Sequence, residues 1–157
     1  MRYQKAFFLT IFIWTAAVAV LPLCWGVSKA IGGDVVVIVN SNNKVSELSI
    51  QDVRMIYKGE KKSWSDGSKI SVFLPPWGSG EMQTMVENVF RCQDEPDVKK
   101  YYLTAIFQQK ITTIPPSLIN GQDAVKKVAN ETGAIAVVKE SEIVGSQGIK
   151  VIQVSGL

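Results

Sequence analysis

The sequence lacks histidine entirely, across all 157 residues. This absence removes the commonest general base and the commonest metal ligand of proteins. Two other nucleophile candidates also lack their usual setting: Ser79 is not in a G-x-S-x-G turn, because Trp77 stands where the first glycine is needed, and Cys92 has no histidine to activate it. We therefore expect a protein that is not an enzyme and that holds no metal and no cofactor.

Cysteine is scarce and the charge is balanced. Cys24 falls in the N-terminal apolar segment, so the rest of the chain has one cysteine and no internal disulfide is expected. Arg2, Lys5 and Lys29 are also N-terminal, which reduces the 17 basic residues to 14 in the remainder, equal to the 14 acidic ones. With no basic tract, the sequence favours neither nucleic-acid binding nor a polybasic membrane contact.

The N-terminus resembles a secretory leader. A basic start precedes an apolar run from Ala6 to Leu23, and a small-x-small cleavage pattern ends at Ala30. This layout predicts a signal peptide over residues 1–30 and a mature domain over residues 31–157, exported to the periplasm. Two alternatives stay open: an uncleaved inner-membrane anchor with the domain facing the periplasm, and a lipoprotein acylated on Cys24.

Periodicity predicts one α/β domain with a small, open, mostly parallel sheet flanked by helices. Continuous β-branched runs of strand length indicate buried strands, and apolar residues at helical spacing follow capping signals. The predicted strands are Val35–Val39, Ile70–Leu74, Ala134–Val138 and Ile149–Ile152, and the predicted helices are 50–58, 82–90, 96–106 and 121–128.

Two small polar segments are candidate anion ligands. Gly78, Ser79 and Gly80 form a loop between a predicted strand and a helix, where backbone N–H groups approach an anion. Asn40 and Ser41 follow the first strand, at the carboxyl end where open α/β sheets usually bind ligands. The alternatives are that Ser79 only caps the helix and that the second segment is only a solvated turn.

Three segments in order resemble phosphate ABC-transporter solute-binding proteins. Residues Val53–Gly59 followed by Trp64–Gly67 are similar to the helix, glycine and W-x-D segment of that family. Residues Pro75–Met82 stand where the family has its R-x-D-G-S-G-T phosphate loop, and Gly133–Val138 resembles its G-A-I-G-Y-V strand. The resemblance covers about residues 35–154 and implies the fold of one lobe of a periplasmic solute-binding protein.

The same resemblance implies phosphate or oxyanion binding in phosphate transport or sensing, with the anion at Gly78, Ser79 and Gly80. Asn40 and Ser41 remain candidates from their position after the first strand. Pro75, Trp77 and Glu81 depart from it, because they replace the family's arginine, aspartate and threonine. A second departure is length, since family members close two lobes on the ligand and only one is matched. The alternative is a protein-interaction module that kept the fold and lost the anion site, with a sensor kinase, a porin or a transporter as partner.

Overall fold

The structure is a computed structural model that describes residues 35–154 and 156–157. The predicted leader over residues 1–30, its alternative as an anchor, and Cys24 lie outside the described residues. Within the described part, no helix is long and apolar enough to cross a membrane.

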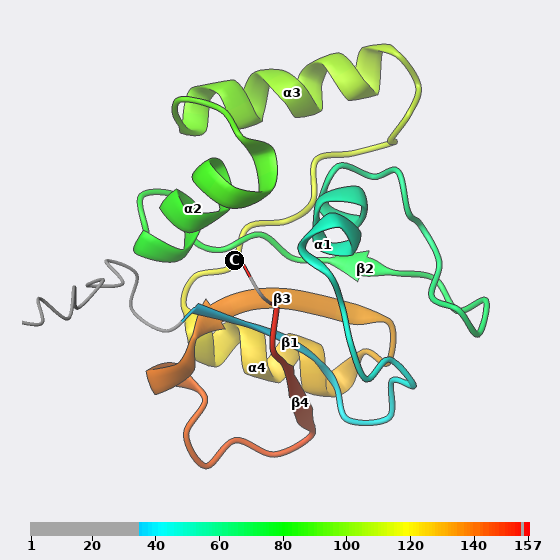
Figure 1. The fold of residues 1–157 in the computed structure, drawn as a ribbon, viewed down its shortest axis with the longest axis vertical. Helices are drawn as coiled ribbons and strands as arrows, with labels where there is room; N and C mark the ends of the chain where they lie inside the picture. The colour runs from blue at the N-terminus through cyan, green and yellow to red at the C-terminus, as the bar shows by residue number, and fades with distance from the viewer. Residues whose placement is uncertain (1–34, 155) are drawn as a thin grey trace, which may run out of the picture.

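The elements follow one another as the sequence predicts, within a few residues. Helices separate the first strands, and two strands close the chain, which confirms an open α/β domain flanked by helices (Figure 1). The strands are β1 (Val35–Asn40), β2 (Ser71–Val72), β3 (Ala134–Lys139) and β4 (Ile149–Ile152), and the helices are α1 (Ile50–Tyr57), α2 (Gly80–Thr84), the π-helix η1 (Met85–Phe90), α3 (Glu95–Phe107), α4 (Gly121–Asn130) and the 3-10 turn η2 (Glu140–Glu142).

The direction of the strands differs from the mostly parallel sheet that we expected. The sheet order is β2-β3-β1-β4; β1 runs antiparallel to both of its neighbours, and only β2 and β3 pair in parallel. A continuous apolar run indicates that both faces of a strand are buried. Helices on both sides of the sheet bury the strands in this way whether they run parallel or antiparallel. This correction matters for the site, because it changes which strand ends lie together.

Alternate residues of the central strands feed two apolar cores. In β1, Val37 and Val39 join the core under α1, α2 and η1, whereas Val36 and Ile38 pack on the other face against α4. Figure 1 shows α4 on one side of the sheet and α1, α2 and α3 on the other, with α3 outermost. The two buried faces fix the register of β1, because a shift by one residue would exchange both sets of side chains.

Side-chain caps define where the helices begin. Ser49 accepts from the backbone N–H of Asp52 and forms a capping box with it at the start of α1. Asp94 caps α3 and Asn120 caps α4 in the same manner. These caps stabilise each helix start by about 1 kcal/mol and leave the loops before them in fixed positions.

Candidate functional site

One end of the sheet gathers the loop that the sequence singled out. Because β2 and β3 are parallel, the loop that leaves β2 and the last residue of β3, Lys139, lie at the same end. A Cβ atom added to Gly80 would lie 4.0 Å from Cε of Lys139. We call this end of the sheet, with Gly78 to Glu81 and Lys139, the loop edge.

The Gly78–Gly80 loop is held by hydrogen bonds within the protein. Gly78 has φ +80°, a left-handed conformation that glycine adopts without strain. Its backbone N–H donates to Oε1 of Glu95 at 2.8 Å, while Oγ of Ser79 accepts from the N–H of Met82 at 3.1 Å. The capping role of Ser79 is therefore observed, and a carboxylate already occupies one amide of the loop.

A buried carboxylate lies directly behind this loop. Glu81, in the first turn of α2, is 4% exposed, and its Oε2 lies 3.5 Å from Nζ of Lys139. That oxygen has no hydrogen-bond partner among the described residues. The Lys139 side chain is 45% exposed, so its ammonium compensates the buried charge from the solvent side. Sequence reasoning missed Lys139, because nothing in the strand pattern says which loop the strand end will reach.

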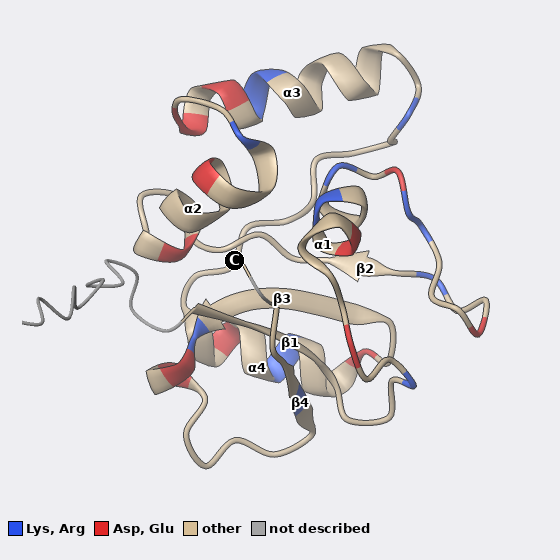
Figure 2. Cartoon of the chain, viewed as in Figure 1, with Lys and Arg blue, Asp and Glu red and all other residues tan. Residues whose placement is uncertain are grey.

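A carboxylate also lies at the start of α4, as that of Glu81 does at the start of α2. The carboxylate of Glu142, in η2, packs so closely on Gly121 that a side chain there would collide with it. Oε2 of Glu142 is buried without a partner in the described part of the chain. Figure 2 shows acidic residues at the start of α2 and in η2, at the same end of the sheet. At the loop edge, the protein's own carboxylates thus face both helix starts, where an external anion would otherwise be favoured.

Asn40 and Ser41 lie at the other end of β1. Nδ2 of Asn40 donates to the carbonyl oxygens of Val128 and Ala129, both at 2.8 Å, and its Oδ1 accepts from the N–H of Asn42. Asn40 is 3% exposed, so its amide serves the C-terminal end of α4. Ser41 is exposed, and its N–H donates to the carbonyl of Gly148 at 3.0 Å.

The structure therefore does not bring the two predicted segments together. Val35 of β1 pairs with Lys139, so the amino end of β1 lies at the loop edge and Asn40 lies about 17 Å away along the strand. No single small anion can contact both segments. Parallel strands would have brought the two segments together, because their carboxyl ends lie at the same end of the sheet, but β1 runs antiparallel to β3.

The remaining singled-out side chains have structural partners. Nε1 of Trp64 donates to the carbonyl of Gly133 at 3.0 Å, and the ammonium of Lys99 lies 4.6 Å above the ring of Trp77. Burial, followed by the nearby acidic residues, raises the pKa of the Cys92 thiol, which disfavours the reactive thiolate. Within the described residues, no three potential ligands cluster in a way that would hold a metal ion.

Known structures share this arrangement over part of their length. The chain is similar to an ABC-type phosphate transport receptor from Vibrio cholerae, with a TM-score of 0.60 and 17% identity over 79% of this chain and 47% of that one. It is similar to a putative phosphate ABC transporter substrate-binding protein with bound phosphate from Clostridium perfringens, with a TM-score of 0.59 and 18% identity over 79% and 46% of the two chains. A phosphate binding protein from Stenotrophomonas maltophilia gives a TM-score of 0.56 and 20% identity over 80% and 40%.

The chain thus spans less than half the length of these structures, and their low identity makes this a likeness of fold. No curated protein matches the sequence. A family model described as a PBP superfamily domain matches residues 29–153, which is most of the chain. The resemblance read from the sequence is confirmed at the level of the family: this chain belongs to the PBP superfamily.

Proposed function

We propose that this protein is an exported, non-catalytic PBP-fold domain that serves phosphate uptake or sensing by contact with another envelope protein. Its partner would be a transporter, a porin or a sensor kinase, and its place the periplasm or the periplasmic face of the inner membrane. The observation that carries the proposal is the buried Glu81 carboxylate behind the Gly78–Gly80 loop, next to Lys139.

Electrostatics disfavours tight capture of phosphate at this loop. A phosphate group at the first amides of α2 would meet the charge of Glu81 at short range, and it would compete with Glu95 for the N–H of Gly78. The chain also corresponds to less than half of the phosphate-receptor structures described above, so a second lobe that excludes water is not supplied by the described residues. Hydrogen bonds to an anion would stay exposed to solvent and would be weak.

Direct oxyanion binding is the second candidate function, and one observation favours it. The backbone N–H groups of Gly80 and Glu81 make no hydrogen bond to another described residue, and the half-exposed ammonium of Lys139 lies beside them. These three donors could hold an oxyanion if Glu81 were neutral or displaced. Asn40 and Ser41 would then belong to a separate site.

Calorimetric titration with phosphate, with sulfate as the control anion, separates the two candidates. The full chain in non-ionic detergent should give no saturable heat, whereas Glu81→Thr should gain measurable phosphate affinity, because it removes the repelling charge. Glu47→Gln, at an exposed position far along the chain, is the matched control for loss of one negative charge. Selective, saturable binding of phosphate by the unmodified chain would overturn the contact proposal in favour of direct capture.

A further inference from the structure

A cavity unrelated to the loop edge opens at the free edge of β2. It has a volume of about 430 Å³ and lies between β2, the end of α1 and the segment 111–116 that links α3 to α4. This volume is within the range of sites that bind small ligands. None of the residues predicted as anion ligands lines it. We call it the β2 groove.

The main chain of β2 leaves a one-residue gap at this groove. The N–H groups of Ser71 and Phe73 donate to the carbonyls of Gly133 and Ile135 in the β3 region, both at 3.0 Å. Because successive residues of a strand alternate, the N–H and C=O of Val72 point the other way, into the groove. Within the described part of the chain, no residue across the groove bonds to them.

The positions on either side of Val72 are already paired. The N–H of Ile70 donates to the carbonyl of Lys62, and the N–H of Leu74 donates to the carbonyl of Pro116, both at 2.9 Å. The two partner segments therefore flank the gap without filling it. A main-chain donor and acceptor exposed in this way on a sheet edge are a template for an added extended strand.

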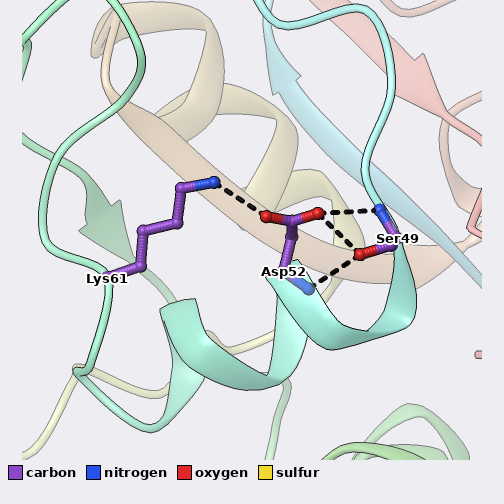
Figure 3. A network of polar contacts seen from close by, with 3 residues as sticks. All are labelled: Ser49, Asp52 and Lys61. Atoms are coloured by element: carbon purple, nitrogen blue, oxygen red, sulfur yellow. Dashed lines mark hydrogen bonds and ion pairs between the residues drawn. The ribbon is translucent and has the colours of Figure 1, made fainter.

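The walls of the β2 groove are apolar and its rim is basic. Val72 and Ile111 are partly buried and contribute apolar surface, while three lysines and one glutamate line the opening. Lys61 is engaged by Asp52 (Figure 3) and Lys62 by the carbonyl of Lys110. The third lysine of the rim, Lys69, is exposed and makes no ion pair with a described residue.

The one acidic residue of the lining does not neutralise this rim. Glu131 accepts a hydrogen bond from the hydroxyl of Ser71, and among the described residues it forms no ion pair with the lysines of the rim. The groove consequently combines an unpaired main-chain N–H and C=O, apolar walls and an available ammonium group. An extended peptide with an acidic side chain matches all three features.

We propose that the β2 groove binds a short extended segment of a partner protein that carries a carboxylate side chain. The backbone of the segment pairs with Val72, its apolar side chains contact Val72 and Ile111, and its carboxylate pairs with Lys69. The inference deepens the proposed contact function by naming the chemistry of the partner, yet it involves neither the loop edge nor phosphate. The two proposals can therefore fail separately.

The test uses fluorescence polarisation with the full chain in non-ionic detergent. The probe is a labelled, end-capped pentapeptide of sequence Thr-Val-Glu-Val-Thr, and the same peptide with lysine in place of glutamate is its control. The acidic peptide should bind saturably and the basic one should not. Lys69→Glu should weaken binding about fivefold, because it reverses one exposed charge. Lys126→Glu, an exposed charge reversal on α4 outside the groove, should leave the affinity unchanged.

Main-chain recognition is tested from both sides. Val72→Pro removes the N–H that faces the groove and leaves the bonds of Ser71 and Phe73 to β3 in place, so it should weaken binding several-fold. Methylation of the peptide's own amide nitrogens should have a similar effect and requires no change to the protein. Glu81→Thr, which lies at the loop edge, should leave the affinity for the peptide unchanged. The proposal is overturned if no saturable binding occurs, if both peptides bind equally, or if free glutarate displaces the peptide at the peptide's own concentration.

Discussion

The network of Ser49, Asp52 and Lys61 predicts how stability should depend on pH (Figure 3). The hydrogen bond from Lys61 at 2.8 Å, followed by that from Ser49, lowers the pKa of the Asp52 carboxyl from 3.8 to about 2. A shift of this size corresponds to at most about 2.4 kcal/mol. Because the two charged side chains are 34% and 29% exposed, solvent screening reduces the expected contribution to about 1 kcal/mol.

Asp52→Asn should therefore lower the free energy of unfolding at pH 7 by about 1 kcal/mol, or the melting temperature by about 4 °C. A carboxyl whose pKa is lowered by folding stabilises the protein above its unfolded pKa, and this stabilisation is lost as pH falls through the folded value. The difference between the variant and the unmodified chain should thus persist down to about pH 4 and disappear near pH 2.

Urea unfolding followed by circular dichroism at pH 7, 4, 3 and 2 measures this difference. Glu47→Gln, which neutralises an exposed carboxylate outside this network, serves as the control. Equal destabilisation of Asp52→Asn at pH 7 and pH 2 would refute the ionic argument and leave only a capping effect. No destabilisation of Asp52→Asn at pH 7 would refute both the ionic and the capping contribution of Asp52.

Two buried positions give further predictions. Asn40→Ala should lower the free energy of unfolding by about 2 kcal/mol in urea unfolding, because two carbonyls at the end of α4 lose their donor; an unchanged midpoint would contradict this role. Gly133→Ala should cost more than about 2 kcal/mol, because its Cβ would collide with the carbonyl oxygen of Lys69, and calorimetric melting would show it. Gly67→Ala, at an open turn, is the milder comparison.

Local features of this fold were predictable because their signals are local. Ser49 before α1 and Ser79 before α2 are capping residues with the helix immediately behind them, and for Ser79 the cap was the alternative to an anion ligand. The β-branched run of β1 and the continuous burial of β3 follow from their composition. The family itself could be read from three short segments in order, and the family model confirms it.

Features that depend on distant pairing could not be predicted. The burial pattern of a strand does not reveal its direction. Only the structure shows that β1 is antiparallel to its neighbours and that Asn40 is therefore separated from the Gly78–Gly80 loop. The approach of Lys139 to Glu81 joins residues far apart in the chain. The unpaired edge at Val72 depends on where Lys62 and Pro116 run, which no periodicity reports.

The central position of β1 makes the order of synthesis matter for folding. Both neighbours of this strand, β3 and β4, are about a hundred residues further along the chain. Such long-range pairing is slow, because the intervening chain must be ordered before contacts compensate its entropy. Until the last strands emerge, the apolar run Val35–Val39 has no partner within the sheet and resembles an aggregation-prone edge. A chain truncated before Ile149 would keep that liability permanently, since one edge of β1 would remain open.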